Sequence, residues 1–277
     1  MQFFMIVNDA EIARFVAAQG VDRLFVDLEW MGKDKRQKGL DTWKSRQTPA
    51  DVSRLREAVP EAHLLVRVNP PHEGTAAEVD DAVARGADSI MLPMIQTLAE
   101  VDHFVDCVAG RAEALPLIET KASLDLIPAM LERVALTRIH IGLNDLHLDM
   151  KLSFMFQPIA DGILEEACAA MRTAGVVFGI GGVARAGEGI VSPEYLLGEH
   201  VRLGSDAAIL SRTFHRGAQT IRELQGVMDF AAEVSALRAI HSGFKTANVD
   251  ALERNRVLTR DRVNDVVHLI RAKKEGA

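Results

Sequence analysis

Two acidic residues follow short apolar runs of this sequence, at positions where metal chemistry is possible. Glu119 comes directly after the run Leu115–Ile118, and Asp145 lies in the segment GLNDL. Two carboxylates that leave other positions open for water and substrate suit Mg²⁺ or Mn²⁺, which favour oxygen ligands in octahedral geometry. Each acid alone also fits a helix start, Glu119 in the first turn and Asp145 as the N-cap. Together they predict a divalent metal site, and the absence of a Cys or His cluster at zinc spacing argues against a structural zinc site.

An arginine interrupts another apolar run, LLVRV, which ends in the segment NPP. Burying Arg67 is costly unless its guanidinium group meets an anion, and this group can bind a carboxylate or an enolate oxygen through two N–H groups. One alternative is a buried ion pair with Asp27 or Glu29, two acids at the end of the run Arg23–Leu28. Acids spaced by two can point the same way along a strand. Both interpretations can hold, so we predict Arg67 as a substrate-binding and catalytic residue beside Asp27 and Glu29.

Cleaving a carbon–carbon bond of an aldol adduct needs a base that takes the proton of the departing hydroxyl group. The candidates are His72 in the segment NPPHEG, Glu29, and a water bound to the metal. His72 also fits an exposed loop histidine. Of the histidines that flank Asp145, His140 is expected in the packing, and His147 is a candidate for a supporting contact with that acid.

Two segments between the apolar runs have unusual compositions. The insertion Trp30–Gln47 is long and basic, which fits either a solvated loop or a lid or rim that attracts anions. The glycine-rich segment Phe178–Gly189 fits either phosphate binding or tight turns. The basic residues of the insertion are Lys33, Lys35, Arg36, Lys38, Lys44 and Arg46.

These residues need a fold that brings the ends of the apolar runs together. Eight short apolar runs alternate with longer segments of helical period, and no hairpin turns join them, which predicts parallel strands buried on both faces. A (β/α)8 TIM barrel, of the α/β class, satisfies this pattern in ~250 residues and places active sites at the carboxyl ends of its strands. The predicted strands are Phe3–Val7, Arg23–Leu28, His63–Val68, Ser89–Leu92, Leu115–Ile118, Arg138–Ile141, Val176–Ile180 and Asp206–Leu210.

Apolar spacing also predicts the later helices. Apolar residues recur every four positions over Ile159–Met171, which predicts one amphipathic helix. A helix is predicted over Ile221–Ile240, and one or two more over Asn248–Lys274. We therefore predict a barrel catalytic domain at residues 1–215, with the final barrel helix and a helical C-terminal extension at 216–277. The extension covers the barrel or packs on a neighbouring subunit.

The composition narrows the class of protein. The 277 residues are 48% apolar and 26% charged, with a net charge of −7, and the basic residues form no long tract of the kind that binds nucleic acid. No apolar run approaches the ~20 residues that span a bilayer, and the first residues lack the basic and apolar regions of a signal peptide. Two cysteines, Cys107 and Cys168, make no disulfide framework. We expect a cytoplasmic enzyme with reduced thiols that acts on a small molecule.

Four segments, in this order, resemble the HpcH/HpaI aldolase and citrate lyase β-subunit superfamily: LLVRVNPP, DSIMLPMIQTLAEVDHFV, LPLIETKASLDLI and HIGLNDLHLDM. The resemblance spans residues 1–215 and implies a metal-dependent barrel that handles pyruvate or acyl-CoA, assembled as a homotrimer or homohexamer. It implies that Glu119 and Asp145 ligate Mg²⁺ or Mn²⁺ and that Arg67 binds the pyruvoyl or enolate group. It also implies that backbone near Gly142 and Asn144 approaches the substrate carboxylate.

Two positions depart from the aldolase pattern. Aldolases of this group usually read D-x-E-H where this chain has Asp27-Leu28-Glu29-Trp30, so an indole that cannot take a proton replaces a histidine base. Leu117 stands where those aldolases have a glutamine, as on the citrate lyase side.

We predict an Mg²⁺-dependent carbon–carbon lyase that cleaves or forms an aldol adduct of pyruvate or another 2-oxo acid through a metal-stabilised enolate. The alternatives are a malyl- or citramalyl-type acyl-CoA lyase or thioesterase, and a metabolite-binding barrel without catalysis.

Overall fold

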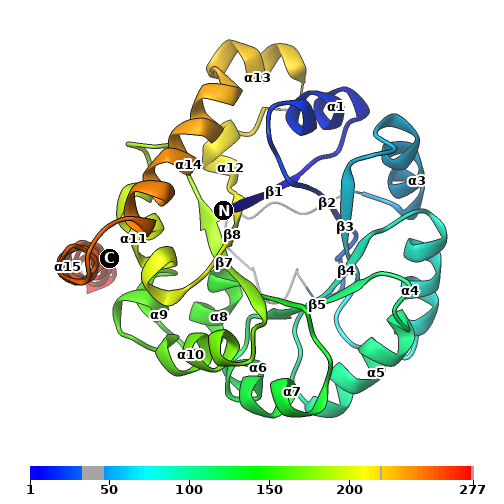
Figure 1. Cartoon of the computed structure of the whole chain (residues 1–277), viewed down its shortest axis with the longest axis horizontal. Coiled ribbons are helices and arrows are strands. Elements are labelled where there is room, and N and C mark those ends of the chain that lie inside the picture. The colour runs from blue at the N-terminus through cyan, green and yellow to red at the C-terminus, as the bar shows by residue number, and fades with distance from the viewer. Residues whose placement is uncertain (33–46, 219, 276–277) are drawn as a thin grey trace.

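The computed structural model describes residues 1–32, 47–218 and 220–275 of the chain. Eight parallel strands follow one another in chain order around a closed barrel, which the pairing of β1 with β8 completes (Figure 1). Helices form a ring outside the strands. The predicted (β/α)8 TIM barrel of the α/β class is therefore confirmed. The strands are β1 Gln2–Ile6, β2 Arg23–Asp27, β3 His63–Arg67, β4 Ser89–Leu92, β5 Glu113–Ile118, β6 Arg138–Ile141, β7 Val177–Val183 and β8 Ala207–Leu210.

The predicted strands differ from the observed ones mainly at β7. This strand continues to Val183, so the first part of the glycine-rich segment lies in the sheet. Its pairing with β8 shifts in register between Gly179 and Gly182. A Cβ atom at residue 179 would lie 2.4 Å from Nδ1 of His140 on β6 and 2.9 Å from the carbonyl oxygen of Ala207 on β8. Glycine is therefore required here by the close approach of neighbouring strands.

The helices begin at polar caps. At the start of α5, Thr97 Oγ1 accepts a hydrogen bond from Glu100 N (3.3 Å) while Glu100 Oε2 accepts one from Thr97 N (2.9 Å), which is a capping box. The helices are α1 Ala10–Ala18, α3 Pro49–Ala58, α4 Thr75–Ala84, α5 Leu98–Val108, α6 Lys121–Asp125, α7 Ile127–Arg133, α8 Leu143–Asp149, α9 Gln157–Ala160, α10 Glu165–Thr173, α11 Pro193–Leu203, α12 Arg212–His215, α13 Ile221–Val227, α14 Phe230–Lys245 and α15 Val249–Glu275.

Two segments predicted as single helices are divided, so those predictions were wrong about continuity. Over Ile159–Met171 the chain forms parts of α9 and α10, separated by a turn in which Gly162 has a φ of +74°. Over Ile221–Ile240 it forms α13 and most of α14, and Asp229 caps α14 by accepting a hydrogen bond from Ala232 N (3.1 Å). The apolar stripe continues across both breaks, because period alone does not show where a left-handed glycine or a cap ends a helix.

Side chains that point into the barrel form three layers, because alternate residues of a strand face the same side. On β2, Arg23 lies in the lower layer, Phe25 in the middle and Asp27 in the upper layer, at the carboxyl ends of the strands. The middle layer is an apolar cluster that fills the barrel. Its members are Phe4, Phe25, Leu65, Met91, Leu115, Leu117 and Ala207.

The lower layer is an ion network at the amino ends of five strands. Arg23 pairs with Glu113, and Arg138 Nε lies 3.3 Å from the other oxygen of Glu113. Ser89 Oγ accepts a hydrogen bond from Arg23 Nη1 (2.8 Å) and donates one to Glu113 (3.0 Å), and His63 Nε2 lies 2.5 Å from it. Two arginines therefore share one glutamate beneath the apolar layer.

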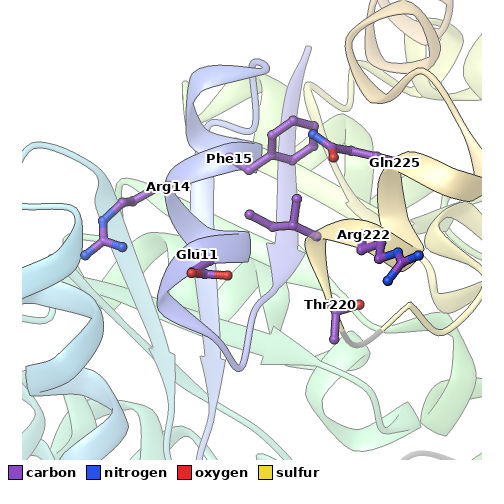
Figure 2. Close-up of a pocket in the computed structure, with 7 residues that line it drawn as sticks. Glu11, Arg14, Phe15, Thr220, Arg222 and Gln225 are labelled. Carbon is purple, nitrogen blue, oxygen red and sulfur yellow. The ribbon is translucent and has the colours of Figure 1, made fainter.

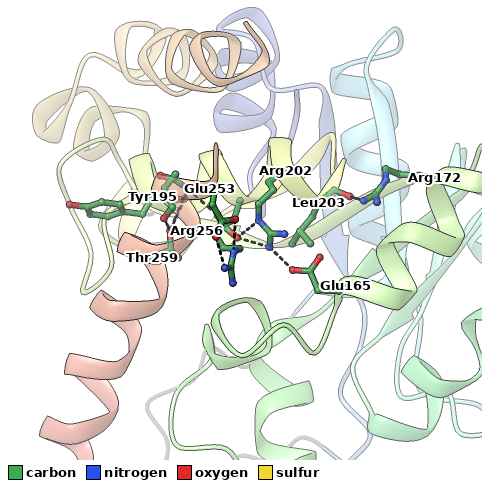
Figure 3. A network of polar contacts seen from close by, with 10 residues as sticks. Glu165, Arg172, Tyr195, Arg202, Leu203, Glu253, Arg256 and Thr259 are labelled. Carbon is green, nitrogen blue, oxygen red and sulfur yellow. Dashed lines mark hydrogen bonds and ion pairs between the residues drawn. The ribbon is translucent and has the colours of Figure 1, made fainter. Parts of the chain in front are cut away.

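The C-terminal tail is one helix, α15, which lies outside the helical ring and packs on α11 and α9 of the same chain (Figure 1). Asn255 Nδ2 on α15 donates a hydrogen bond to Glu199 Oε1 (3.1 Å) on α11, where Gly198 leaves the space that the amide occupies. Arg202 joins Glu199 to Glu165 on α10, with Nη2 2.7 Å from an oxygen of each (Figure 3). Packing on a neighbouring subunit stays a prediction. Among the described residues, no helix is long and apolar enough to cross a membrane.

Candidate functional site

The upper layer brings Asp27, Glu29 and Arg67 together at the carboxyl ends of β2 and β3. The strands pair so that Asp27 lies opposite Arg67. Arg67 Nε and Nη2 each lie 2.9 Å from one oxygen of Asp27, and Nε lies 3.3 Å from Glu29 Oε2. Both carboxylates are almost fully buried. The structure thus places the two acids around the arginine, and their catalytic roles stay predictions.

The guanidinium group of Arg67 stays charged in this setting. Burial lowers the pKa of Arg67, but the charges of Asp27, Glu29 and Glu119 outweigh burial, so the net shift of its pKa is upward. Its Cζ lies 5.4 Å from the centre of the Phe25 ring, so the group caps the apolar middle layer. Since Asp27 occupies Nε and Nη2, Nη1 is the guanidinium nitrogen left for a substrate oxygen within the described part of the chain.

Glu119 lies at the carboxyl end of β5, one residue before Thr120, the N-cap of α6. It is therefore not in the first turn of the helix, which was the structural alternative for this acid. Its side chain is 3% exposed, and Oε1 accepts a hydrogen bond from Met94 N (3.0 Å) after β4. Met94 has a φ of +57°, a left-handed conformation that costs a non-glycine residue about 1–3 kcal/mol. The strained residue thus supplies the N–H group that orients the carboxylate.

Gly142, Asn144 and Asp145 follow β6, the strand next to β5. Gly142 N donates a hydrogen bond to Ile118 O (2.8 Å), which sets it beside Glu119. Gly142 is the N-cap of α8, and Asp145 lies in the first turn of this helix, so Asp145 is not the N-cap that the sequence allowed. Asn144 lies in the same turn and is partly buried.

The carboxylates at these two strand ends are of the kind that a magnesium or manganese ion prefers, and their role as its ligands stays a prediction. Glu119 and Asp145 supply carboxylate oxygens, and Gly142 leaves room beside Glu119 Oε2, where a Cβ atom would come within 3.1 Å. Within residues 1–32, 47–218 and 220–275, no group of three or more His, Cys, Asp or Glu side chains is arranged to hold a metal ion. A site with two protein carboxylates leaves the other octahedral positions to water and substrate, as Mg²⁺ prefers.

Asn69 and Glu78 support the carboxyl end of β2, and neither was among the predicted site residues. Asn69 Oδ1 accepts hydrogen bonds from Trp30 N and Met31 N, both at 3.0 Å. Glu78 on α4 holds the other side of Asn69, with Oε1 2.7 Å from Nδ2 and Oε2 3.0 Å from the backbone N. The position of Asn69 just after a predicted strand indicates that it lies at the carboxyl-end face of the barrel. Nothing in the sequence marks Glu78 as its partner.

His72 lies at the start of α4 and is held by two contacts. Its Nδ1 accepts a hydrogen bond from Gly74 N (2.9 Å), and its Nε2 lies 3.2 Å from Glu78 Oε1. The ring also borders a groove between the starts of α4 and α5. Nδ1 thus accepts a hydrogen bond from the turn before α4, and Nε2 faces a carboxylate of α4 and not the strand ends, whereas a general base needs a nitrogen that faces the substrate.

The two histidines around Asp145 are structural in their contacts. His140 is fully buried in the barrel, where its ring centre lies 5.8 Å from that of Phe4, as expected of a packed residue. Burial lowers the pKa of His140 to about 4. His147 Nδ1 lies 3.2 Å from the carbonyl oxygen of Leu143 within α8, and burial lowers its pKa as well. A supporting contact of His147 with Asp145 stays a prediction.

The basic insertion and the glycine-rich segment remain open. Residues 33–46 lie outside the described residues, so a lid or anion-attracting rim stays a prediction. In the glycine-rich segment, Arg185 is buried, with Nη2 2.8 Å from Glu188 Oε2 and Nη1 3.3 Å from the carbonyl oxygen of Val227 at the end of α13. These contacts tie the segment to α13. Phosphate binding there also stays a prediction.

A groove of about 600 Å³ lies away from these strand ends, between α1 and the segment that begins α13 (Figure 2). None of the predicted site residues lines it, so the candidate site rests on the geometry of the strand ends and not on this groove. The groove is lined by Glu11, Arg14, Phe15, Thr220, Ile221, Arg222 and Gln225.

Comparison with known protein families shows which family has this sequence pattern. Residues 1–188, more than half of the chain, match the HpcH/HpaI aldolase/citrate lyase family. The chain belongs to this family. Members are generally dependent on divalent metals, and membership supports a lyase- or aldolase-type activity. Among proteins with curated functions, none matches the chain in sequence.

Three solved structures share the fold of this chain. An HpcH/HpaI aldolase from Desulfitobacterium hafniense DCB-2 is 18% identical, with a TM-score of 0.55 over 86% of this chain and 92% of that one. An HpcH/HpaI aldolase/citrate lyase family protein from Burkholderia cenocepacia J2315 is 17% identical, with a TM-score of 0.61 over 82% and 94%. The citrate synthase SbnG is 15% identical, with a TM-score of 0.59 over 85% and 94%. At these identities the likeness establishes the common barrel.

Trp30 is the main departure of this family member from the aldolase pattern. Its indole is 69% exposed, while its backbone N–H is fixed by Asn69. An indole offers a flat apolar surface and one N–H donor but no acceptor for a proton. Any base must therefore come from another residue or from water.

Proposed function

We propose that this protein is a divalent-metal-dependent carbon–carbon lyase that cleaves or forms an aldol adduct of pyruvate or another 2-oxo acid through an enolate. The observation that carries the proposal is the two-point ion pair between Asp27 and Arg67, which aims a permanently charged guanidinium group across the barrel mouth. Glu119 lies close enough to Arg67 to raise the arginine's pKa. In the proposed site, the carboxylate of Glu119 would hold the metal and the guanidinium group of Arg67 would meet the enolate oxygen.

Each residue has a defined task in this proposal. Glu119 and Asp145 would hold the metal, which would supply Lewis-acid chemistry at the ketone of the 2-oxo acid. Arg67 Nη1 donates to the oxygen that gains negative charge as the enolate develops, so the transition state is stabilised more than the ground state. Gly142 N is engaged with Ile118 O (2.8 Å), so the backbone N–H group offered to a substrate carboxylate is that of Asn144, while Gly142 leaves room for its approach.

The base in the proposed reaction is Glu29 or a water bound to the metal. Glu29 Oε2 lies 3.3 Å from Arg67 Nε, so its carboxylate stands beside the group that receives the enolate. Asp27 is fully engaged with the guanidinium group and orients it. His72 is the weakest of the candidates, because its Nδ1 accepts from Gly74 N and its Nε2 faces Glu78.

A second candidate function is acyl-CoA chemistry, as a malyl- or citramalyl-type lyase or a thioesterase. Leu117 favours it, because this residue stands where the aldolases have a glutamine, as on the citrate lyase side of the family. A metabolite-binding barrel without catalysis is the third. Against it stand two buried acids kept close to one arginine, an arrangement that is expensive to retain without use. The homo-oligomeric assembly and the cytoplasmic location are parts of the same proposal.

Exchange of the pyruvate methyl protons in D₂O tests the proposal, because enolate formation replaces those protons with deuterium and needs no aldehyde partner. We expect Mg²⁺-dependent loss of the methyl signal in proton NMR with the wild-type protein. Glu119→Ala should abolish it, whereas Glu132→Ala, a change of an exposed acid on α7, should not.

Thermal unfolding with Mg²⁺ plus oxalate, an enolate analogue, measures binding separately. A ligand at a hundredfold excess over its Kd stabilises the native state by ~2.7 kcal/mol, which raises the Tm. If the wild-type protein shows no exchange and no Tm shift, the shared metal and 2-oxo acid site is refuted. A Tm shift without exchange would favour the acyl-CoA or binding alternatives. Incubation with malyl-CoA would then separate them, because a lyase forms glyoxylate and acetyl-CoA, a thioesterase releases free thiol, and a binding protein does neither.

A further inference from the structure

We infer that Asn69 and Glu78 form a hydrogen-bonded relay, with His72 in polar contact with Glu78, that positions Glu29 and Trp30 at the mouth of the barrel. The inference rests on the proposed function, because it assigns positioning residues to the same site. It also changes the role of His72, which the sequence analysis named as a candidate base and which here is a positioning residue.

Three successive backbone N–H groups after β2 are held by side chains. Glu29 N donates to Asp27 Oδ1 (3.2 Å), and the next two, Trp30 N and Met31 N, donate to Asn69 Oδ1 (3.0 Å each). The turn that carries Glu29 toward Arg67 is therefore fixed by Asp27 on one side and Asn69 on the other. Asn69 is 3% exposed, so loss of its oxygen leaves two N–H groups without that partner.

Glu78 decides which way the amide of Asn69 faces. A carboxylate only accepts, and the two oxygens of Glu78 accept from Asn69 Nδ2 (2.7 Å) and from Asn69 N (3.0 Å). The amide must therefore turn its NH₂ group toward Glu78 and its oxygen toward Trp30 and Met31. The opposite orientation would set NH₂ against two N–H donors.

His72 completes the relay from the far side of Glu78. Its Nδ1 accepts from Gly74 N (2.9 Å), so the proton of the neutral ring is on Nε2, which faces Glu78 Oε1 at 3.2 Å. Gly74 permits this approach, because a Cβ atom there would lie 2.6 Å from Cε1 of the ring. Hydrogen bonds therefore join Gly74 to the His72 ring and Asn69 to Glu78, and the 3.2 Å contact of His72 Nε2 with Glu78 Oε1 lies between them.

The relay predicts how paired substitutions interact. Asn69→Asp sets a second carboxylate against Glu78, and Glu78→Gln sets an NH₂ group against the donors of Asn69. Each single change should lower the rate of pyruvate methyl exchange about tenfold, within the range for directly coupled neighbours. In the double variant the new amide can donate to the new carboxylate, whose other oxygen still accepts from Trp30 and Met31. We expect it to be faster than Asn69→Asp alone.

A readout at Trp30 keeps the test independent of the reaction. The chain has two tryptophans, so a Trp43→Phe background leaves Trp30 as the single emitter. Acrylamide quenching and anisotropy of Trp30 should show a looser indole in Asn69→Ala, Asn69→Asp and Glu78→Gln, and a recovery in the double variant. Asn248→Ala, which removes an exposed amide that accepts from Ala251 N, is the control and should leave Trp30 unchanged.

A separate pair of variants distinguishes positioning from base catalysis at His72. His72→Asn retains an acceptor for Gly74 N, whereas His72→Ala removes it. A positioning role predicts that His72→Asn recovers most of the exchange rate lost in His72→Ala, with the pH profile unshifted. A base predicts that both variants lose exchange by about 10²–10⁴-fold. Equal loss in both variants overturns the positioning role.

Failure of the relay and failure of the proposed function give different results. If wild-type protein exchanges pyruvate but the Asn69 and Glu78 variants keep both its rate and its Trp30 signal, the relay is wrong and the function stands. If wild-type protein does not exchange pyruvate but Trp30 loosens and recovers as described, the relay stands and the function is wrong. Urea unfolding of each variant confirms that the protein is folded, and Asn69→Ala replaces Asn69→Asp if the acid prevents folding.

Discussion

At the scale of single residues, the site depends on buried charges that constrain one another. Arg67 is clamped by two oxygens of Asp27, and Glu29 reaches the same guanidinium group from two residues further along the chain. A buried ion pair is costly to assemble, and breaking it is worse, because one charge then stays buried without its partner. We therefore infer that the Asp27–Arg67 pair serves to orient the guanidinium group of Arg67 and not to stabilise the fold.

Asp27→Asn should therefore be strongly destabilising. The neutral amide can accept only one guanidinium N–H and offers no compensating charge, so we expect a loss of ~3 kcal/mol in the free energy of unfolding. Urea denaturation monitored by circular dichroism measures it. Asp80→Asn, which removes an acid paired with Arg111 on the surface, should cost less than ~1 kcal/mol. Equal losses in the two variants would show that the Asp27 pair is no better coupled than a surface pair.

At the scale of elements, the ends of strands and the starts of helices create the functional positions. Parallel pairing sets Asp27 opposite Arg67 and Gly142 beside Glu119, so residues far apart in sequence become neighbours. Glycines allow neighbouring elements to approach closely, because they have no Cβ atom. Gly142 leaves space at the carboxylate of Glu119, and Gly179 lets β7 pass the ring of His140.

Gly179→Ala should distort the barrel. The added methyl group would meet the His140 ring at 2.4 Å and the Ala207 carbonyl oxygen at 2.9 Å, and both lie in a packed interior that cannot move freely. We expect destabilisation of ~1–3 kcal/mol, as for other overpacked cores. Differential scanning calorimetry is the measurement. Gly226→Ala on α13, where a Cβ atom meets nothing within 4 Å, should leave the Tm unchanged or higher.

At the scale of the whole molecule, an apolar layer separates two polar ends of the barrel. The lower network of Arg23, Glu113 and Arg138 and the upper cluster of Asp27 and Arg67 lie on the same inward-facing stripes. The cluster that includes Phe25 lies between them. This arrangement keeps the structural charges away from the candidate site. The interior also buries His140 and His200, and burial favours the neutral form of each ring.

Stability should therefore fall as the pH drops from about 6.5. His140 has its pKa lowered to about 4 and His200 to about 3, chiefly by burial, whereas in the unfolded chain they titrate near 6.5. Between these values the unfolded state binds more protons, so acid favours unfolding by up to ~1.4 kcal/mol per pH unit for each histidine. Tm measured from pH 8 to pH 4 checks this. His140→Gln should flatten the profile, and His268→Gln, a change of an exposed residue on α15, should not.

Much of this molecule could be predicted from local pattern, and the exceptions have physical reasons. Apolar runs separated by helical segments predicted the eight strands, because strands buried on both faces need continuous apolar sequence. The breaks at Gly162 and Asp229 were missed, because the apolar stripe continues through them. Glu119 and Asp145 were visible as acids after strands. Met94, whose N–H holds Glu119, was not, because a backbone donor leaves no trace in residue type.

The sequence by itself determined the barrel, its family and the chemical types at the strand ends, since these follow from periodicity and from acids and an arginine at fixed spacings. Only the tertiary structure decided which groups meet. It paired Arg67 with Asp27 at two points, turned both ring nitrogens of His72 toward α4 and the turn before it, and set Glu78 against Asn69. The reason is physical: hydrogen-bond partners across strands and loops depend on register and on ångström-scale distances, which sequence separation does not encode.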